Sequence, residues 1–86
     1  MAEKHSIMVV DDHPIIHDGL KTLMDSEDDL VIVETATSAT EAEELLTTGL
    51  PDIAIVDLSL GDSDGTYLIQ RIKQKHKQLK ILVYTM

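Results

Sequence analysis

Cysteine is absent from the 86 residues of this chain, which excludes disulfide bonds and is compatible with a reducing compartment. Tryptophan and phenylalanine are absent too, and two tyrosines are the only large aromatic side chains. The core must therefore be aliphatic and lacks large anchoring side chains. A chain of this length forms one domain at most, with a modest core.

Basic residues are scarce, because seven Lys and Arg stand against sixteen Asp and Glu, a net charge of −9. Nucleic-acid affinity comes mostly from Lys and Arg that neutralise phosphates, so the composition disfavours direct contact with DNA or RNA. Long apolar runs are also missing: the start is polar, and Ile7 to Val10 is far too short for a signal peptide or a membrane span. We therefore expect a cytoplasmic location without membrane contact.

Short apolar runs alternate with helical patterns along the chain. Four runs rich in Val, Ile and Leu predict buried strands at residues 6–10, 30–34, 53–57 and 81–84. Apolar residues at helical spacing predict helices from Pro14 to about Ser26, from Ser38 to a stop at Gly49 and Pro51, and around Leu68 and Ile72. Strands that alternate with helices over short links indicate a parallel α/β sheet.

Two local patterns refine this picture. Ser38 and Glu41 have the spacing of a capping box, which predicts where the second helix begins. The polar segment from Ser59 to Gly65 contains two glycines and predicts a loop with unusual backbone angles.

Acidic side chains follow two of the predicted strands. Asp11 and Asp12 come after the first strand, Asp57 ends the third, and Thr85 follows the fourth. The carboxyl ends of parallel strands share one edge, where ligands bind in open α/β sheets. Carboxylates held this close repel one another unless a positive group lies among them, and oxygen donors favour a hard cation such as Mg²⁺.

Each acid could also have a purely local role, because Asp11 and Asp12 precede a helix and Asp57 ends a strand. The conjunction of all three favours a site instead. An aspartate in such a place can act as a nucleophile and form an aspartyl-phosphate. His13 follows the acid pair, but the oxygen-rich surroundings argue against its being a metal ligand.

A set of spaced motifs resembles the receiver domain of bacterial two-component response regulators. The motifs are Val9-Val10-Asp11-Asp12-His13-Pro14, Ile55-Val56-Asp57-Leu58, Asp64-Gly65 and Val83-Tyr84-Thr85-Met86. The opening motif is similar to that of the subgroup that includes NarL and FixJ, whose receivers usually precede a helix-turn-helix DNA-binding domain. The resemblance implies a flavodoxin-like (CheY-like), doubly wound fold with strand order 2-1-3-4.

The resemblance also implies roles for individual residues. Asp57 would accept a phosphoryl group from the phosphohistidine of a histidine kinase. Asp12 and Asp57 would ligate Mg²⁺ directly, with the backbone carbonyl of Ser59 as a third ligand and Asp11 acting mainly through water. Thr85 would be the switch hydroxyl that bonds the phosphoryl oxygen. Such a module assists its own phosphorylation and dephosphorylation and is not a turnover enzyme.

The chain departs from the family after its fourth strand. In the family a fourth helix, a fifth strand and a fifth helix follow, and the fifth strand carries a lysine that pairs with the phosphate. Residues 1–86 therefore correspond to the N-terminal two-thirds of a receiver. The apolar fourth strand would then lie at a sheet edge, which predicts either a dimer or larger assembly through that strand or a poorly folded monomer.

Two other functions compete with the phosphoacceptor. The first is a phosphorylation-incompetent receiver fragment that serves as an assembly or dimerisation module. The second is a phosphatase or phosphomutase with an aspartate nucleophile. Those enzymes commonly carry a second aspartate two residues after the first, and Ser59 occupies that place here.

Overall fold

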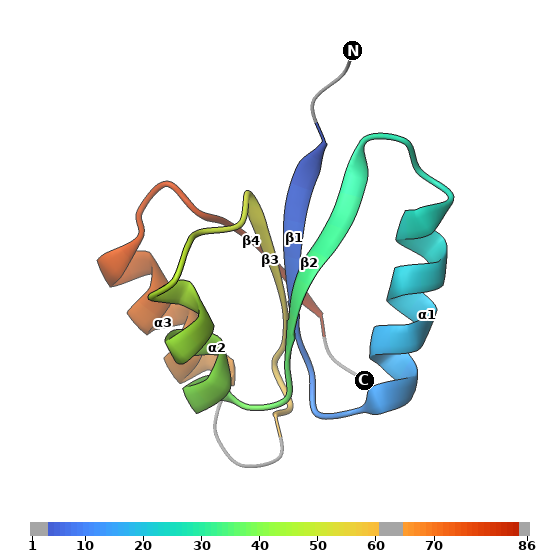
Figure 1. The fold of residues 1–86 in the computed structure, drawn as a ribbon. Coiled ribbons are helices and arrows are strands. Elements are labelled where there is room, and N and C mark those ends of the chain that lie inside the picture. The colour runs from blue at the N-terminus through green and yellow to red at the C-terminus, as the bar shows by residue number, and fades with distance from the viewer. Residues whose placement is uncertain (1–3, 61–64, 85–86) are drawn as a thin grey trace.

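Four parallel strands form one sheet with helices on both faces, in a computed structural model that describes residues 4–60 and 65–84 (Figure 1). In chain order the elements are β1 (His5–Val10), α1 (Pro14–Asp25), β2 (Leu30–Ala36), α2 (Ala39–Leu46), β3 (Ile53–Asp57), α3 (Gly65–Lys75) and β4 (Lys80–Tyr84). The strand order is β2-β1-β3-β4. The predicted α/β fold and its strand order are confirmed. Within the described residues, every helix is too short or too polar to cross a membrane.

The two central strands are buried on both faces, as their unbroken apolar sequences predict. Along β1, Ile7 and Val9 face the side covered by α1, whereas Met8 and Val10 face α2 and α3. This alternation follows from the two-residue period of a strand. The apolar runs from Ile7 to Val10 and from Ile53 to Val56 pair residue by residue, so β1 and β3 reach the acids at their carboxyl ends in register.

The ends of the elements show where local chemistry corrects the predictions. Ser38 caps α2 as predicted, since its Oγ accepts from the Glu41 amide at 3.1 Å. The predicted stop at Gly49 is wrong: α2 ends at Leu46, where the hydroxyl of Thr47 and that of Thr48 bond the last carbonyls. Likewise β2 continues to Ala36, beyond the predicted residue 34, where the Ala36 carbonyl accepts from the Asp11 amide at 2.9 Å.

Gly65 begins α3 rather than forming a loop with unusual angles, and its φ is not positive. Gly61, the other glycine of the predicted loop, lies outside the described residues. The absence of a side chain at Gly65 matters for packing. A Cβ there would lie 2.6 Å from the Asp57 carbonyl oxygen and 2.8 Å from the Leu58 Cα. Glycine thus lets the start of α3 approach the end of β3.

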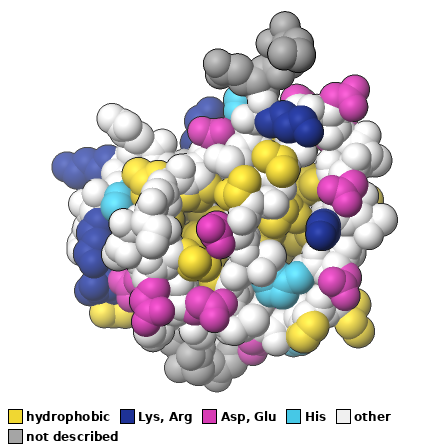
Figure 2. Space-filling model, viewed as in Figure 1, with side chains coloured by type: hydrophobic (Ala, Val, Ile, Leu, Met, Phe, Trp, Pro, Cys, Tyr) yellow, Lys and Arg dark blue, Asp and Glu magenta, His cyan; other side chains and the backbone are white. Residues whose placement is uncertain are grey.

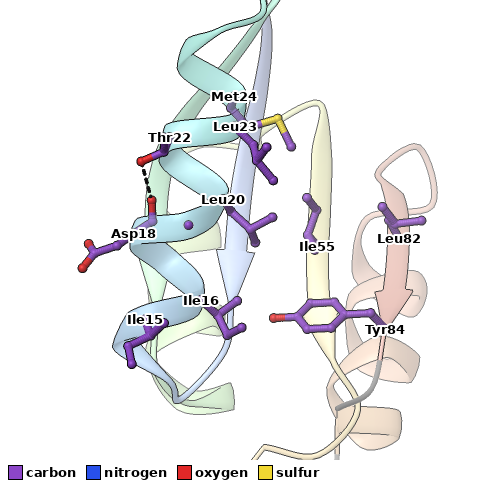
Figure 3. A pocket seen from close by; sticks show the side chains of 11 residues that line it. Ile15, Ile16, Asp18, Leu20, Thr22, Leu23, Met24, Ile55, Leu82 and Tyr84 are labelled. Atoms are coloured by element: carbon purple, nitrogen blue, oxygen red, sulfur yellow. Dashed lines mark hydrogen bonds between the residues drawn. The ribbon is translucent and has the colours of Figure 1, made fainter.

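An apolar groove of about 980 Å³ opens between α1 and β4 (Figure 3). Side chains of both elements and of β3 line it, among them Ile16, Leu20, Leu23, Ile55, Leu82 and Tyr84. Basic side chains gather on the opposite side of the molecule, along α3 (Figure 2), where Arg71 pairs with Glu43 of α2. The face of the sheet under α1 is therefore only partly covered, whereas the other face is covered by two helices.

We predict opposite effects of alanine at two glycines. Gly65→Ala should lower the free energy of unfolding by about 1–3 kcal/mol, because its Cβ would collide with backbone that cannot rotate away. Gly19→Ala, inside α1 with no heavy atom within 4 Å of the new Cβ, should raise that free energy by about 0.5–1 kcal/mol. Urea unfolding followed by circular dichroism measures both. A Gly65→Ala variant as stable as the parent would contradict the close approach.

Candidate metal centre

Carboxylates from two adjacent strands meet at one edge of the sheet. Asp11 follows β1 directly and Asp57 is the last residue of β3, and β1 pairs with β3 so that Val10 lies opposite Val56. Both aspartates have 0% of their surface exposed. This edge, at the bottom of the view in Figure 1, is where the chain leaves β1 and β3 for the segments that precede α1 and α3.

Asp57 is held by one of its two oxygens. Its Oδ1 accepts hydrogen bonds from the amide and from the hydroxyl of Ser59, each at 2.9 Å. Its Oδ2 is buried and has no hydrogen-bond partner within the described part of the chain. A buried carboxylate oxygen is costly without a partner, so this atom marks a place for a ligand.

Both oxygens of Asp11 are bonded. Its Oδ1 accepts from the His13 amide at 2.7 Å and lies 2.7 Å from the His13 Nδ1. Its Oδ2 accepts from the hydroxyl of Tyr84, which comes from the end of β4. The end of β4 therefore contributes to the site as well as to the sheet.

The imidazole of His13 lies among all three carboxylates. Besides Asp11, its Nδ1 is 3.0 Å from Asp12 Oδ1 and 3.9 Å from Asp57 Oδ2. The His13 side chain is 50% exposed, whereas those of Asp11 and Asp57 are fully buried. The ring thus lies between the buried acids and the solvent.

Electrostatics at the site follow from these contacts. Burial acts to raise the pKa of Asp11, but hydrogen bonds from Tyr84 and His13 outweigh it and the pKa falls below its ordinary value. The hydrogen bond with Asp11, helped by the charges of Asp12 and Asp57, raises the pKa of His13. Burial, together with the bond to Asp11, raises the pKa of the Tyr84 hydroxyl. The contact between Asp11 and His13 therefore favours the charged form of each group.

The structure brings together most of the residues that the sequence predicts for the site. Ligand atoms of Asp11, Asp12, His13 and Asp57 all lie within 4.8 Å of one another. Ser59 is adjacent, with its amide and hydroxyl on Asp57. Thr85, the predicted switch residue, lies outside the described residues.

Two residues of the site were missed by sequence reasoning. Tyr84 was seen only as part of a strand, although its place opposite Asp57 in the β3–β4 pairing puts it at the same edge. The helical pattern of residues 14–26 gave His17 no role, yet it is partly buried and its Nε2 lies 2.6 Å from the Asp11 carbonyl oxygen. The signal for His17 was its spacing, because it lies one helical turn after the start of α1.

This arrangement can do two things chemically. Carboxylate oxygens that converge with one unpartnered atom fit a divalent cation. A carboxylate with one oxygen fixed and the other directed at such a cation can also serve as a nucleophile toward phosphorus.

The chain is similar to bacterial transcription regulators. A family profile described as the response regulator receiver domain matches residues 7–86. The chain is 32% identical over 81 residues to the transcriptional regulatory protein YdfI of Bacillus subtilis, covering 94% of this chain and 38% of that protein. It is 42% identical over 79 residues to the virulence transcriptional regulatory protein PhoP of Salmonella typhimurium, covering 92% and 34%. The chain thus spans well under half of these curated relatives.

Solved structures show the same likeness. A two-component response regulator of the LuxR family from Aurantimonas has a TM-score of 0.89 at 34% identity, over 98% of this chain and 60% of that one. The isolated receiver domain of RcsB from Salmonella enterica, in the presence of the phosphomimetic BeF3-, has a TM-score of 0.89 at 30% identity, over 98% and 63%. This chain therefore belongs to the response regulator receiver domain family.

Proposed function

We propose that Asp57 accepts a phosphoryl group from the phosphohistidine of a histidine kinase. The observation that carries this proposal is the buried Oδ2 of Asp57, which has no hydrogen-bond partner in the described structure while Ser59 fixes Oδ1. In the transfer, the Asp57 carboxylate attacks phosphorus and the phosphorus–nitrogen bond breaks. The electron pair returns to the kinase imidazole, which takes up a proton.

Mg²⁺ is the cofactor we propose for this site. The donors present are oxygen-rich and include an unpartnered buried atom, which suits a hard cation. Asp12 and Asp57 would bind Mg²⁺ directly, together with the backbone carbonyl of Ser59, and Asp11 would act mainly through water. Bound Mg²⁺ supplies positive charge against the negative charge of the transferred group.

The chain's own residues do the remaining work. Ser59 holds the orientation of Asp57, and Tyr84 with His13 holds Asp11. The half-exposed His13 ring lies 3.9 Å from Asp57 Oδ2, so an incoming phosphohistidine would meet this ring next to the acceptor. Thr85 keeps its proposed role as the switch hydroxyl, and the chain assists its own phosphorylation and dephosphorylation.

The wider setting is also a proposal. Residues 1–86 would form the N-terminal two-thirds of a receiver, in line with the 63% of the isolated RcsB receiver that the chain matches. Because relatives are named as transcriptional regulators, the receiver would control a DNA-binding output domain in the cytoplasm.

Millimolar Mg²⁺ should raise the melting temperature of the chain. A ligand that binds only the folded state stabilises it by about 2.7 kcal/mol at a hundred times its Kd, which is several degrees for a small domain. Asp12→Ala should abolish this rise. Asp18→Ala, which removes an exposed acid on α1, should leave it intact. Equal responses in both variants would place Mg²⁺ elsewhere, and differential scanning calorimetry decides.

Acetyl phosphate with Mg²⁺ should add one phosphoryl group to the chain, detected by intact mass spectrometry. Asp57→Asn should remove the adduct because the amide is no nucleophile, whereas Asp18→Asn should keep it. Beryllofluoride, which mimics the phosphoryl group, should raise the melting temperature further in the parent and not in Asp57→Asn. Neither an adduct nor a beryllofluoride response would favour the assembly function instead.

A second candidate function, self-association, rests on the edge of the sheet. Among the described residues β4 lies at one edge of the sheet, and Leu82 and Val83 are 59% and 40% exposed on it. The groove beside β4 is lined mainly by apolar side chains (Figure 3). An unpaired apolar edge next to an apolar surface favours pairing with a second copy. We propose a dimer in which β4 strands pair.

Leu82→Lys should convert the dimer into a monomer, because a charge on an edge strand opposes pairing. Val33→Lys makes a matched control on β2, the opposite edge of the sheet, where Val33 is 49% exposed. Size-exclusion chromatography with light scattering measures the mass of each. A compact, stable monomer of the parent chain would refute the proposal.

A further inference from the structure

His13 holds Asp11 in the proposed Mg²⁺ site but is not one of the ligands proposed there. Its Nδ1 lies 2.7 Å from Asp11 Oδ1, 3.0 Å from Asp12 Oδ1 and 3.9 Å from Asp57 Oδ2. These contacts have two explanations. Either the ring occupies the position of a bound cation, or it lies beside that position as a further ligand to the cation.

The distances favour a donor. With metal–ligand bonds of about 2.1 Å, neighbouring ligands of an octahedral ion lie about 3.0 Å apart and opposite ligands about 4.2 Å apart. The separations of His13 Nδ1 from Asp12 Oδ1 and Asp57 Oδ2, the two proposed direct ligands, are 3.0 and 3.9 Å and fall in this range, whereas the 2.7 Å to Asp11 Oδ1 is a hydrogen-bond distance. A nitrogen in the ion's own place would be nearly equidistant from the three oxygens, whereas the separation from Asp57 is clearly the longest.

Two further features place the ring for ligation. The His13 amide donates to Asp11 Oδ1 at 2.7 Å and Pro14 follows, so the backbone of His13 is fixed in an extended conformation at the start of α1. Independently, the buried Asp57 Oδ2, which lacks a hydrogen-bond partner in the described chain, points to a ligand within the same cluster. The half-exposed ring is accessible to an ion from solution.

Imidazole changes which ion the site favours. Oxygen donors suit Mg²⁺, whereas an imidazole nitrogen suits Co²⁺, Ni²⁺ and Zn²⁺. We propose that His13 is a ligand, and that it gives the site a preference for a first-row transition ion such as Co²⁺ or Zn²⁺ over Mg²⁺. This inference rests on the metal site of the proposed function and adds a further ligand and a second class of ion that the site would bind.

Isothermal titration of the 86-residue chain with Co²⁺ and with Mg²⁺, at one fixed pH, tests the inference. His13→Ala should weaken Co²⁺ binding at least about tenfold while Mg²⁺ binding weakens little. His13→Asn keeps an amide donor toward Asp11 but offers no imidazole, so it should lose the same Co²⁺ preference. His5→Ala is the matched control, because it removes an imidazole 3.8 Å from Asp52 at the far end of β1.

The visible absorption of bound Co²⁺ gives a second measure, because its bands depend on nitrogen ligation. They should change in both His13 variants and stay unchanged in His5→Ala. If both ions bind the parent and the His13 variants bind Co²⁺ with the same affinity and spectrum, the ligand role is overturned and the Mg²⁺ site stands. Tighter binding of both ions in His13→Ala would show that the ring blocks the site. Binding of neither ion to the parent would overturn the metal site itself.

Discussion

Burying two carboxylates at the ends of adjacent strands is costly unless each accepts hydrogen bonds. The rest of the structure depends on the groups that donate those hydrogen bonds. Asp11 accepts from His13 and Tyr84, and Asp57 accepts from Ser59. The donors come from the turns that follow β1 and β3 and from the end of β4. The three strands must therefore end together for the acids to be buried at all, which ties the register of the sheet to the chemistry of the site.

The apolar core meets this requirement through two unbroken apolar runs, from Ile7 to Val10 in β1 and from Ile53 to Val56 in β3. Each strand alternates its side chains between the layer under α1 and the layer under α2 and α3, so slipping by one residue would exchange the two layers. At the end of β3, Gly65 brings α3 against the backbone of Asp57 and Leu58. Backbone packing thus fixes the position of Asp57 before any ligand binds.

The sequence predicted the architecture well because buried strands and helices place their apolar residues in regular patterns along the sequence. The run Ile53-Ala54-Ile55-Val56 indicated a strand buried on both faces, and the shared edge followed from parallel topology. The hydrogen-bond partners of individual side chains produce no such pattern in the sequence. The contact of Tyr84 with Asp11 joins residues 73 positions apart and depends on the twist and pairing of β4. The helix α2 ends at Leu46 because the hydroxyls of Thr47 and Thr48 bond its last carbonyls. The sequence pattern instead favoured Gly49 as the end of this helix.

The charges at the site explain why one imidazole cannot complete it. Three carboxyl groups lie around a single imidazole, so one ring can offset at most one negative charge, and a divalent cation can offset the others. Phosphorylation of Asp57 would add negative charge at the same place, so the need for a cation grows as the reaction proceeds. A protonated His13 supplies part of this compensation only while no ion is bound. A ring that stays in the cluster when the ion enters does so by coordinating it, since an imidazolium would repel it.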